Sequence, residues 1–266
     1  MMSDSTEMTD DVKNAVELMK NGKFEDAIAA FKDLLDTHEE NRAEIFNNIG
    51  VAYANLGKNE EAEENFVNSL KINPTFAQTY INLADLYYKR QELELAIDIL
   101  STGESYLPND VVISHYLARI YMEDARLDLA IDELDKVLEI QPENYDAYYD
   151  LAKVYFDMGD WSSAIANFES VLEYKQNNAL IYYYLGQAYE ANDEIDKAIS
   201  NYLKTLTINE KFHPAYKKLG ILFLARKDYE DSLEYFNEYI EHDIPQEEID
   251  NTKKIIKKVE ALINER

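Results

Sequence analysis

Apolar and small residues recur along this chain with the spacing of short helices and with a longer period of 34 residues. Within residues 43–76, Ile49 and Tyr53 are four positions apart, which places them on one face of a helix. A second apolar stretch with Ala62 and Phe66 follows a polar interruption, and a proline ends it because proline cannot continue a helix. This segment therefore predicts two short helices joined by a tight turn.

The same two-helix pattern repeats along the chain in constant phase. The small residue of the second helix falls at every 34th position, as Ala62, Ala96, Ala130, Ala164, Ala198 and Ser232. The small residue of the first helix is Ala15, Gly50, Ala84, Ala118, Ala152, Gly186 or Gly220. Two helices approach closely only where a side chain is small, because a larger side chain would overpack the contact and lower stability by about 1–3 kcal/mol. A fixed period of this length is typical of a stacked array of helix pairs.

The repeated pattern resembles the tetratricopeptide repeat family, although aromatic residues other than tryptophan stand at the family's tryptophan position. The resemblance covers seven repeats, at 8–41, 43–76, 77–110, 111–144, 145–178, 179–212 and 213–246. It implies an all-α fold, a right-handed superhelical solenoid of antiparallel helix pairs in which the first helices line a concave groove. Residues 1–7 are expected to form a mobile acidic N-terminus.

The last segment, residues 247–266, does not continue the repeat and is predicted to form a C-terminal capping helix. Ile249, Ile256, Val259 and Ile263 make an apolar stripe along it. Such a helix would cover the apolar face that the last repeat otherwise exposes. The lysines beside the stripe leave a second interpretation open, a basic interaction tail.

Repeat 3 departs from the pattern at one point. It has Gly103 and Glu104 where other second helices continue with a small and then a large apolar residue. Glycine in a helix costs about 1 kcal/mol relative to alanine. We therefore expect a lost apolar contact there and a weak junction between repeats 3 and 4.

Composition narrows the classes of function. The 266 residues are 46% hydrophobic and 30% charged, contain no cysteine and carry a formal net charge of −27. The missing cysteines exclude disulfides and thiolate sites, and the negative charge argues against nucleic acid and anionic membranes as partners. The acidity has two interpretations, attraction to basic partners or the solubility of an elongated protein.

No pattern of catalytic or metal-binding residues emerges. The four histidines are far apart, and no phosphate-binding glycine loop, nucleophile motif or calcium loop occurs. An enzyme or metal-binding protein is therefore improbable, and no cofactor is expected. No signal peptide or membrane-spanning run is visible, which predicts a cytoplasmic protein without membrane insertion.

The resemblance also indicates which side chains face the groove. Over the seven repeats these positions hold seven acids and seven bases, so the excess negative charge lies elsewhere on the protein. The candidate peptide-binding residues are Asn47, Asn48, Asn82, Asp85, Tyr116, Arg119, Tyr149, Asp150, Lys153, Tyr183 and Tyr184. In some relatives, asparagines in successive repeats hold a peptide backbone, because an amide both donates and accepts hydrogen bonds. Here that series ends after Asn82.

The tyrosines among these candidates have two interpretations. Tyrosine is enriched at interfaces because it offers a large contact area at low entropy cost. Alternatively, Tyr183 and Tyr184 pack against rings of adjacent repeats. If the first holds, replacing Tyr149 and Tyr183 by alanine should abolish partner capture and leave the melting temperature nearly unchanged.

The sequence as a whole predicts a non-enzymatic scaffold that binds a protein or peptide segment in its concave groove. The alternative is a subunit that self-associates through its edges or ends, and the oligomeric state is left open.

Overall fold

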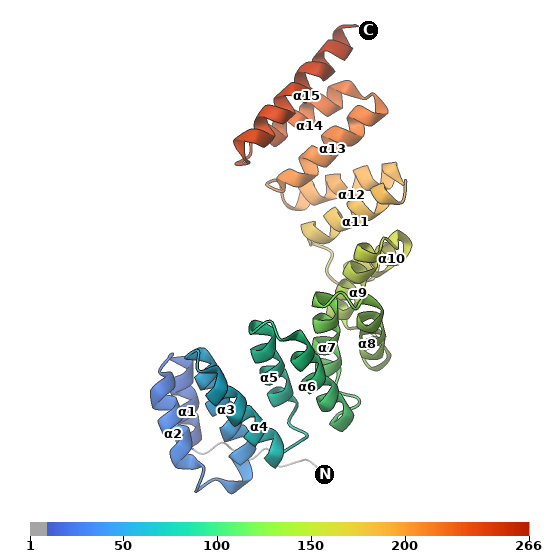
Figure 1. Ribbon diagram of the computed structural model, residues 1–266. Coiled ribbons are helices and arrows are strands. Elements are labelled where there is room, and N and C mark those ends of the chain that lie inside the picture. Colours follow the sequence, from blue (N-terminus) through green and yellow to red (C-terminus); the bar gives the residue numbers. More distant parts are fainter. Residues whose placement is uncertain (1–9, 266) are drawn as a thin grey trace. The chain divides into compact units, whose positions relative to one another are not determined.

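The computed structural model describes residues 10–265, and within them the regular secondary structure is helical (Figure 1). The helices form consecutive pairs joined by short turns. The pairs are α1 (Asp10–Lys20) with α2 (Phe24–Leu34), α3 (Arg42–Asn55) with α4 (Asn59–Ile72), α5 (Ala77–Lys89) with α6 (Leu93–Tyr106), α7 (Val111–Glu123) with α8 (Leu127–Ile140), α9 (Tyr145–Met158) with α10 (Trp161–Leu172), α11 (Ala179–Ala191) with α12 (Ile195–Ile208), and α13 (His213–Arg226) with α14 (Tyr229–Ile240). A 3₁₀ turn, η1 (Glu39–Asn41), precedes α3, and α15 (Gln246–Asn264) follows α14. The expected mobile terminus at 1–7 lies outside the described residues.

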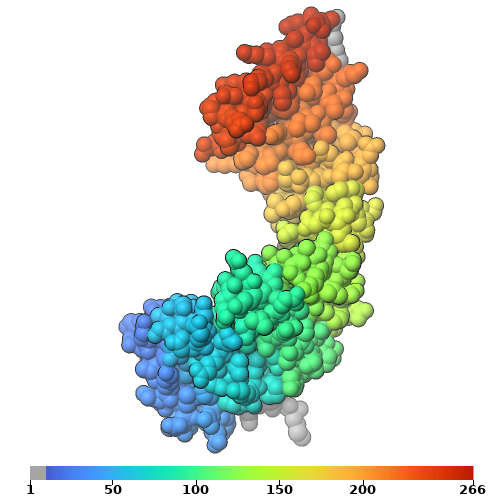
Figure 2. Space-filling model, viewed as in Figure 1, coloured from blue at the N-terminus to red at the C-terminus, as the bar shows by residue number. Residues whose placement is uncertain are grey.

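The chain divides into two compact units, Met1–Pro142 and Glu143–Arg266. The first contains α1 to α8, and the second contains α9 to α15. Within each unit the two helices of a pair contact each other, and the second helix contacts the first helix of the next pair. Side chains fill the spaces between the ribbons of each unit (Figure 2). The all-α architecture of stacked helix pairs expected from the sequence is confirmed.

Close helix contacts within the pairs depend on the small residues of the first helices. A Cβ atom added to Gly50 would lie 2.6 Å from the Phe66 ring, and one on Gly186 would lie 2.5 Å from the Tyr202 ring. Both rings are almost fully buried. The alternation of small and large residues along the period thus sets how closely the paired helices pack.

The turn inside each pair uses a left-handed residue at one repeat position. Gly22 and Gly57 have φ values of 72° and Gly159 has 77°, a conformation that glycine adopts without a steric penalty. Four other pairs place a residue with a side chain there, namely Gln91, Ala125, Asp193 and Lys227. The turn geometry is therefore shared by all pairs, and the sequence shows it only where glycine occurs.

The expected loss of contact at Gly103 is wrong. A Cβ on Gly103 would lie 2.8 Å from the Tyr80 ring, and Tyr80 is itself buried. The absent side chain makes room for this large ring, so an aromatic contact replaces the aliphatic one. Glu104 beside it accepts a hydrogen bond from Lys136 of α8 at 2.7 Å. The weak junction between repeats 3 and 4 stays a prediction, but the loss of an apolar contact no longer supports it.

Helix α15 packs against α14 and closes the second unit (Figure 1). Its buried face carries Thr252, Ile256 and Val259, and the predicted stripe residues Ile249 and Ile263 are half-buried at the edge of that face. The opposite side is basic and exposed. No helix within residues 10–265 is long and apolar enough to cross a membrane.

Candidate functional site

The candidate site in the first unit lies between α5 and α7, the first helices of neighbouring pairs, which contact each other. Leu83 and Ala84 of α5 and Leu117 of α7 are buried and hold the two helices in the stack. The start of α7 is fixed by Asp110, whose Oδ1 accepts hydrogen bonds from the backbone N–H groups of residues 112 and 113 at 3.0 and 3.1 Å. An aspartate at this cap position stabilises a helix by about 1 kcal/mol.

A cavity of about 190 Å³ opens between these two helices. It is lined by Ala84, Asp85 and Tyr88 of α5 and by Tyr116, Arg119, Ile120 and Glu123 of α7. Three predicted groove residues, Asp85, Tyr116 and Arg119, are therefore brought together in one concave site. A space of this size fits one large side chain of a partner.

The polar groups of the cavity are only partly used within the protein. Asp85 Oδ2 pairs with Lys89 Nζ at 2.6 Å. Arg119 and Glu123 form no ion pair or hydrogen bond with another residue of the described part of the chain. Tyr88 and Tyr116 are 39% and 36% exposed. The cavity therefore offers a guanidinium donor, a carboxylate acceptor and two rings to an incoming segment, and its charges balance to zero with Lys89 included.

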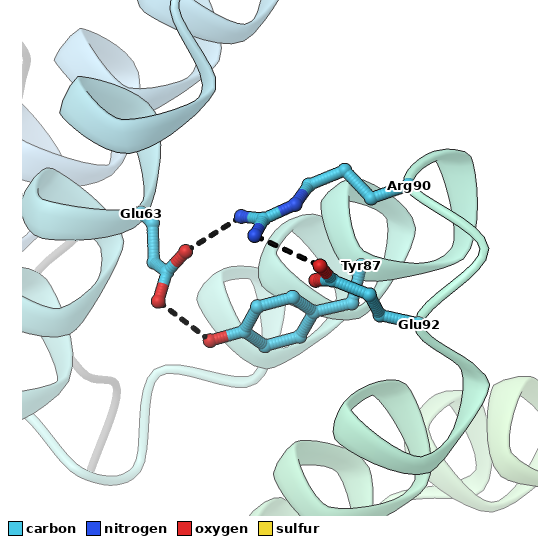
Figure 3. Close-up of polar contacts among 4 residues, drawn as sticks. All are labelled: Glu63, Tyr87, Arg90 and Glu92. Carbon is cyan, nitrogen blue, oxygen red and sulfur yellow. Dashed lines mark hydrogen bonds and ion pairs between the residues drawn. The ribbon is translucent and has the colours of Figure 1, made fainter.

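The end of α5, which carries the cavity residue Tyr88, is held against α4 by polar contacts. Tyr87, next to the cavity residue Tyr88, donates a hydrogen bond to Glu63 Oε1 at 3.1 Å, and Arg90 bridges Glu63 and Glu92 at 2.8 and 2.9 Å (Figure 3). Burial and the adjacent Glu63 carboxylate raise the pKa of Tyr87 to about 12. These contacts join the end of α5 to α4 next to Tyr88.

The predicted ligand contact at Asn47 is wrong, because this side chain is only 4% exposed. Its Oδ1 lies 3.1 Å from Thr79 Oγ1 and accepts a hydrogen bond from Asn82 Nδ2 at 2.8 Å. Thr79 also contacts Ser69, which reaches the Ala43 carbonyl at 2.7 Å. Asn47 thus belongs to a buried polar network that joins α3, α4 and α5.

The two other asparagines differ in how far they remain available. Asn82 is half-buried, donates to Asn47 and accepts a hydrogen bond from Gln78 Nε2 at 2.9 Å. Asn48 is half-buried, and its amide forms no hydrogen bond with any residue between 10 and 265. Of the predicted amide series, only Asn48 keeps both its donor and its acceptor for a ligand.

The predicted residues of the second unit form a separate set, and its rings pack into the core. Tyr184 stacks on Phe168 with ring centroids 5.6 Å apart, and Tyr149 lies 6.2 Å from the same ring. Tyr183 lies 4.9 Å from Phe212. Burial raises the pKa of Tyr149 and of Tyr183. Asp150 and Lys153 of α9 are half-buried.

This packing overturns one expectation. Replacing Tyr149 and Tyr183 by alanine removes buried ring contacts, so it must lower stability and cannot leave the melting temperature nearly unchanged. A charged groove residue of the second unit also forms hydrogen bonds within the protein. Glu190 Oε2 accepts hydrogen bonds from Tyr202 at 2.7 Å and from Lys218 at 3.0 Å. The first unit, by contrast, leaves Arg119 and Glu123 unpaired.

Besides the buried Ala84 and Ile120, the lining residues Tyr88 and Glu123 were absent from the predicted set. Both occupy groove-facing positions of the repeat, but neither belongs to the asparagine series or to the cluster of rings in the middle repeats. The signal that finds them is structural, because Tyr88 at the end of α5 and Glu123 at the end of α7 line the same cavity as Tyr116 and Arg119. Residues 10–265 contain no group of three or more side chains suited to a metal ion.

Comparison with known proteins finds repeat models of one kind along the chain. Models of the tetratricopeptide repeat match residues 43–76, 121–166, 153–193 and 179–212. A curated relative, the tetratricopeptide repeat domain-containing protein PYG7 of Arabidopsis thaliana chloroplasts, is 29% identical over 77 residues. That match covers 29% of this chain and only 26% of the relative.

Solved structures share the fold over longer stretches. The C-terminal part of a TPR repeat-containing protein from Cytophaga hutchinsonii has a TM-score of 0.76 and 19% identity, covering 90% of this chain and 98% of that one. MamA has a TM-score of 0.58 and 26% identity, covering 60% and 93%. YrrB, described as a TPR protein with an unusual peptide-binding site, has a TM-score of 0.61 and 20% identity, covering 71% and 97%.

Proposed function

We propose that this chain, which belongs to the tetratricopeptide repeat family, is a scaffold that binds a segment of another protein and catalyses no reaction. The repeat fold is used in general for protein–protein interaction. The partner segment binds on the concave surface of the first unit, around the cavity between α5 and α7. The observation that carries it is the gathering of exposed tyrosines with an unpaired Arg119 and Glu123 in that cavity.

The chemistry of the cavity suits one protruding side chain and its flanking backbone. The rings of Tyr88 and Tyr116 supply contact area at low entropy cost, and aromatic and arginine residues dominate the binding energy of protein interfaces. Arg119 can donate to backbone carbonyls or a carboxylate, while Glu123 can accept from backbone N–H groups. Asn48 adds an amide with both capacities on α3 of the same unit.

The charge of the chain supports a protein partner over nucleic acid. The net charge of −27 opposes a phosphate backbone, and the groove positions themselves are balanced. A cytoplasmic location, expected from the sequence, remains a prediction.

The test places a photo-crosslinking amino acid at one position at a time and identifies the captured proteins from the source cell by mass spectrometry. Tyr116 is the test position. Leu129 of α8, which is similarly exposed but does not line the cavity, is the matched control. We expect a defined partner to crosslink at 116 and not at 129. Equal capture at both positions, or none at 116, would refute this location.

A further inference from the structure

A second surface lies on the other helices of the first unit, away from the cavity. A groove of about 420 Å³ runs between α4 and α6 and is lined by Val67, Leu70, Lys71, Pro74, Tyr80, Ile99, Thr102 and Tyr106. Tyr106 is 52% exposed, and Val67, Leu70 and Ile99 are half-buried. This part of the surface is therefore apolar and open to solvent.

The apolar groove continues into an acidic one along α4. An adjoining space of about 360 Å³ shares Val67 and Lys71 with it and is lined further by Glu60, Glu63, Glu64 and Asn68. Glu63 is engaged by Tyr87 and Arg90 (Figure 3). Glu60 and Glu64 are exposed and form no ion pair within the described residues. Two unneutralised carboxylates thus lie one helical turn apart on the outward side of α4.

Helix α15 carries the complementary charges. Lys253, Lys254, Lys257 and Lys258 are exposed, and none of them forms an ion pair with another residue of the range 10–265. Lys254 and Lys258 lie opposite the buried face of the helix, and Leu262 follows one turn later with 40% exposure. In a chain with 26 basic and 53 acidic residues, such an unpaired basic stripe is conspicuous.

The two stripes match in spacing. On α4, Glu60, Glu64 and Lys71 are exposed at relative positions 0, 4 and 11. Lys254 and Lys258 of α15 and Glu265, which follows the helix directly and keeps helical backbone angles, have the same spacing with opposite charges. At about 1.5 Å rise per residue, both sets span about 17 Å. With the two helices parallel, Leu262 lies level with the stretch between Val67 and Leu70, beside the apolar groove. A single register of the two helices would therefore align three opposite-charge pairs and one apolar contact.

We propose that the basic face of α15 docks in the groove of α4 and α6 of a second copy of this chain. The two surfaces differ, so the contact is heterologous, and each added copy leaves one groove and one α15 face available for another. The Debye length is about 8 Å at physiological ionic strength, so repulsion between the acidic bodies is screened beyond the contact while the facing charge pairs are retained. This self-association is separate from partner binding at the cavity.

The test uses reciprocal charge reversal in the full chain. Wild-type protein should show a mass above the monomer that rises with concentration in sedimentation velocity. Glu60→Lys with Glu64→Lys should abolish this, and so should Lys254→Glu with Lys258→Glu. Mixing these two variants should restore association, because each supplies the surface that the other needs. Circular dichroism verifies that the exposed substitutions leave the fold intact.

The matched control reverses Asp128 and Asp132 of α8, which occupy the equivalent positions of repeat 4 and change the net charge equally. This control should associate as wild type does. Raising salt from roughly 0.1 to 1 M shortens the Debye length from about 10 to about 3 Å and should weaken association. A monomer at every concentration, association strengthened by salt, or no recovery on mixing would overturn the proposal.

Discussion

The neighbouring asparagines Asn47 and Asn48 provide a matched test of how the first unit is held together. Both stand on α3 at groove-facing repeat positions, and the sequence alone gives them the same role. In the structure Asn47 is buried and bonded to Thr79 and Asn82, whereas the Asn48 amide forms no hydrogen bond in the described chain. Alanine at each position should therefore have effects of opposite sign.

The magnitudes follow from the bonds lost. Asn47→Ala removes two buried hydrogen bonds worth about 1 kcal/mol each and gains about 0.6 kcal/mol of helix propensity. The net expectation is a loss of about 1–2 kcal/mol in the free energy of unfolding. Asn48→Ala loses no bond, so the propensity term alone predicts a gain of up to about 0.6 kcal/mol.

Urea denaturation followed by far-UV circular dichroism measures both variants against wild type. If the two units unfold in separate transitions, the transition of the unit that contains α3 is compared. A double-mutant cycle with Thr79→Val should show coupling to Asn47 and none to Asn48. Equal shifts for both variants, or an unchanged midpoint for Asn47→Ala, would refute the assignment of Asn47 to a structural network.

Three further predictions, with four substitutions, test other parts of the structure. Tyr183→Ala should lower the free energy of unfolding by about 2 kcal/mol or more because it empties ring contacts in the second unit, measured by denaturation of the purified variant. Burial raises the pKa of Glu133, on α8, above its ordinary value of 4.5, because folding disfavours the charged carboxylate. The protonated Glu133 therefore contributes to the free energy of unfolding below pH 4.5, and this contribution is lost as the pH rises through the folded-state pKa. Glu133→Gln should therefore stabilise the protein at neutral pH and lose that advantage in acid, as thermal melts across pH will show. Ala125→Gly should stabilise its left-handed turn by about 0.5–1 kcal/mol, while Gly159→Ala should destabilise its turn by a similar amount; opposite results in denaturant titrations would contradict the turn geometry.

The backbone architecture could be predicted because it depends on a repeated local signal. The 34-residue period predicted the helix pairs. The close contact between Gly50 and the Phe66 ring depends only on residues of a single repeat. Such relations are fixed by helix geometry and recur whatever the neighbouring repeats contain. The sequence predicted the left-handed turn at Gly57 but not at Ala125, because a glycine at a turn indicates a positive φ and an alanine does not.

Side-chain roles were harder to predict because they depend on what the next repeat supplies. Asn47 is buried because Thr79, in the following repeat, offers it a polar partner at the interface. Gly103 is accommodated because Tyr80 presents a ring to it across the pair. The cavity exists where Tyr88 and Tyr116 in successive repeats both stay exposed, and a pattern averaged over seven repeats does not contain such a coincidence.

The affinity of the partner captured at position 116 tests the central claim most directly. Isothermal titration would compare wild type with Tyr116→Ala and with the control Leu129→Ala. A central tyrosine in an interface is worth about 2 kcal/mol or more, so the dissociation constant should rise about 30-fold or more for Tyr116→Ala and stay unchanged for Leu129→Ala. An unchanged affinity for Tyr116→Ala would contradict a binding site between α5 and α7.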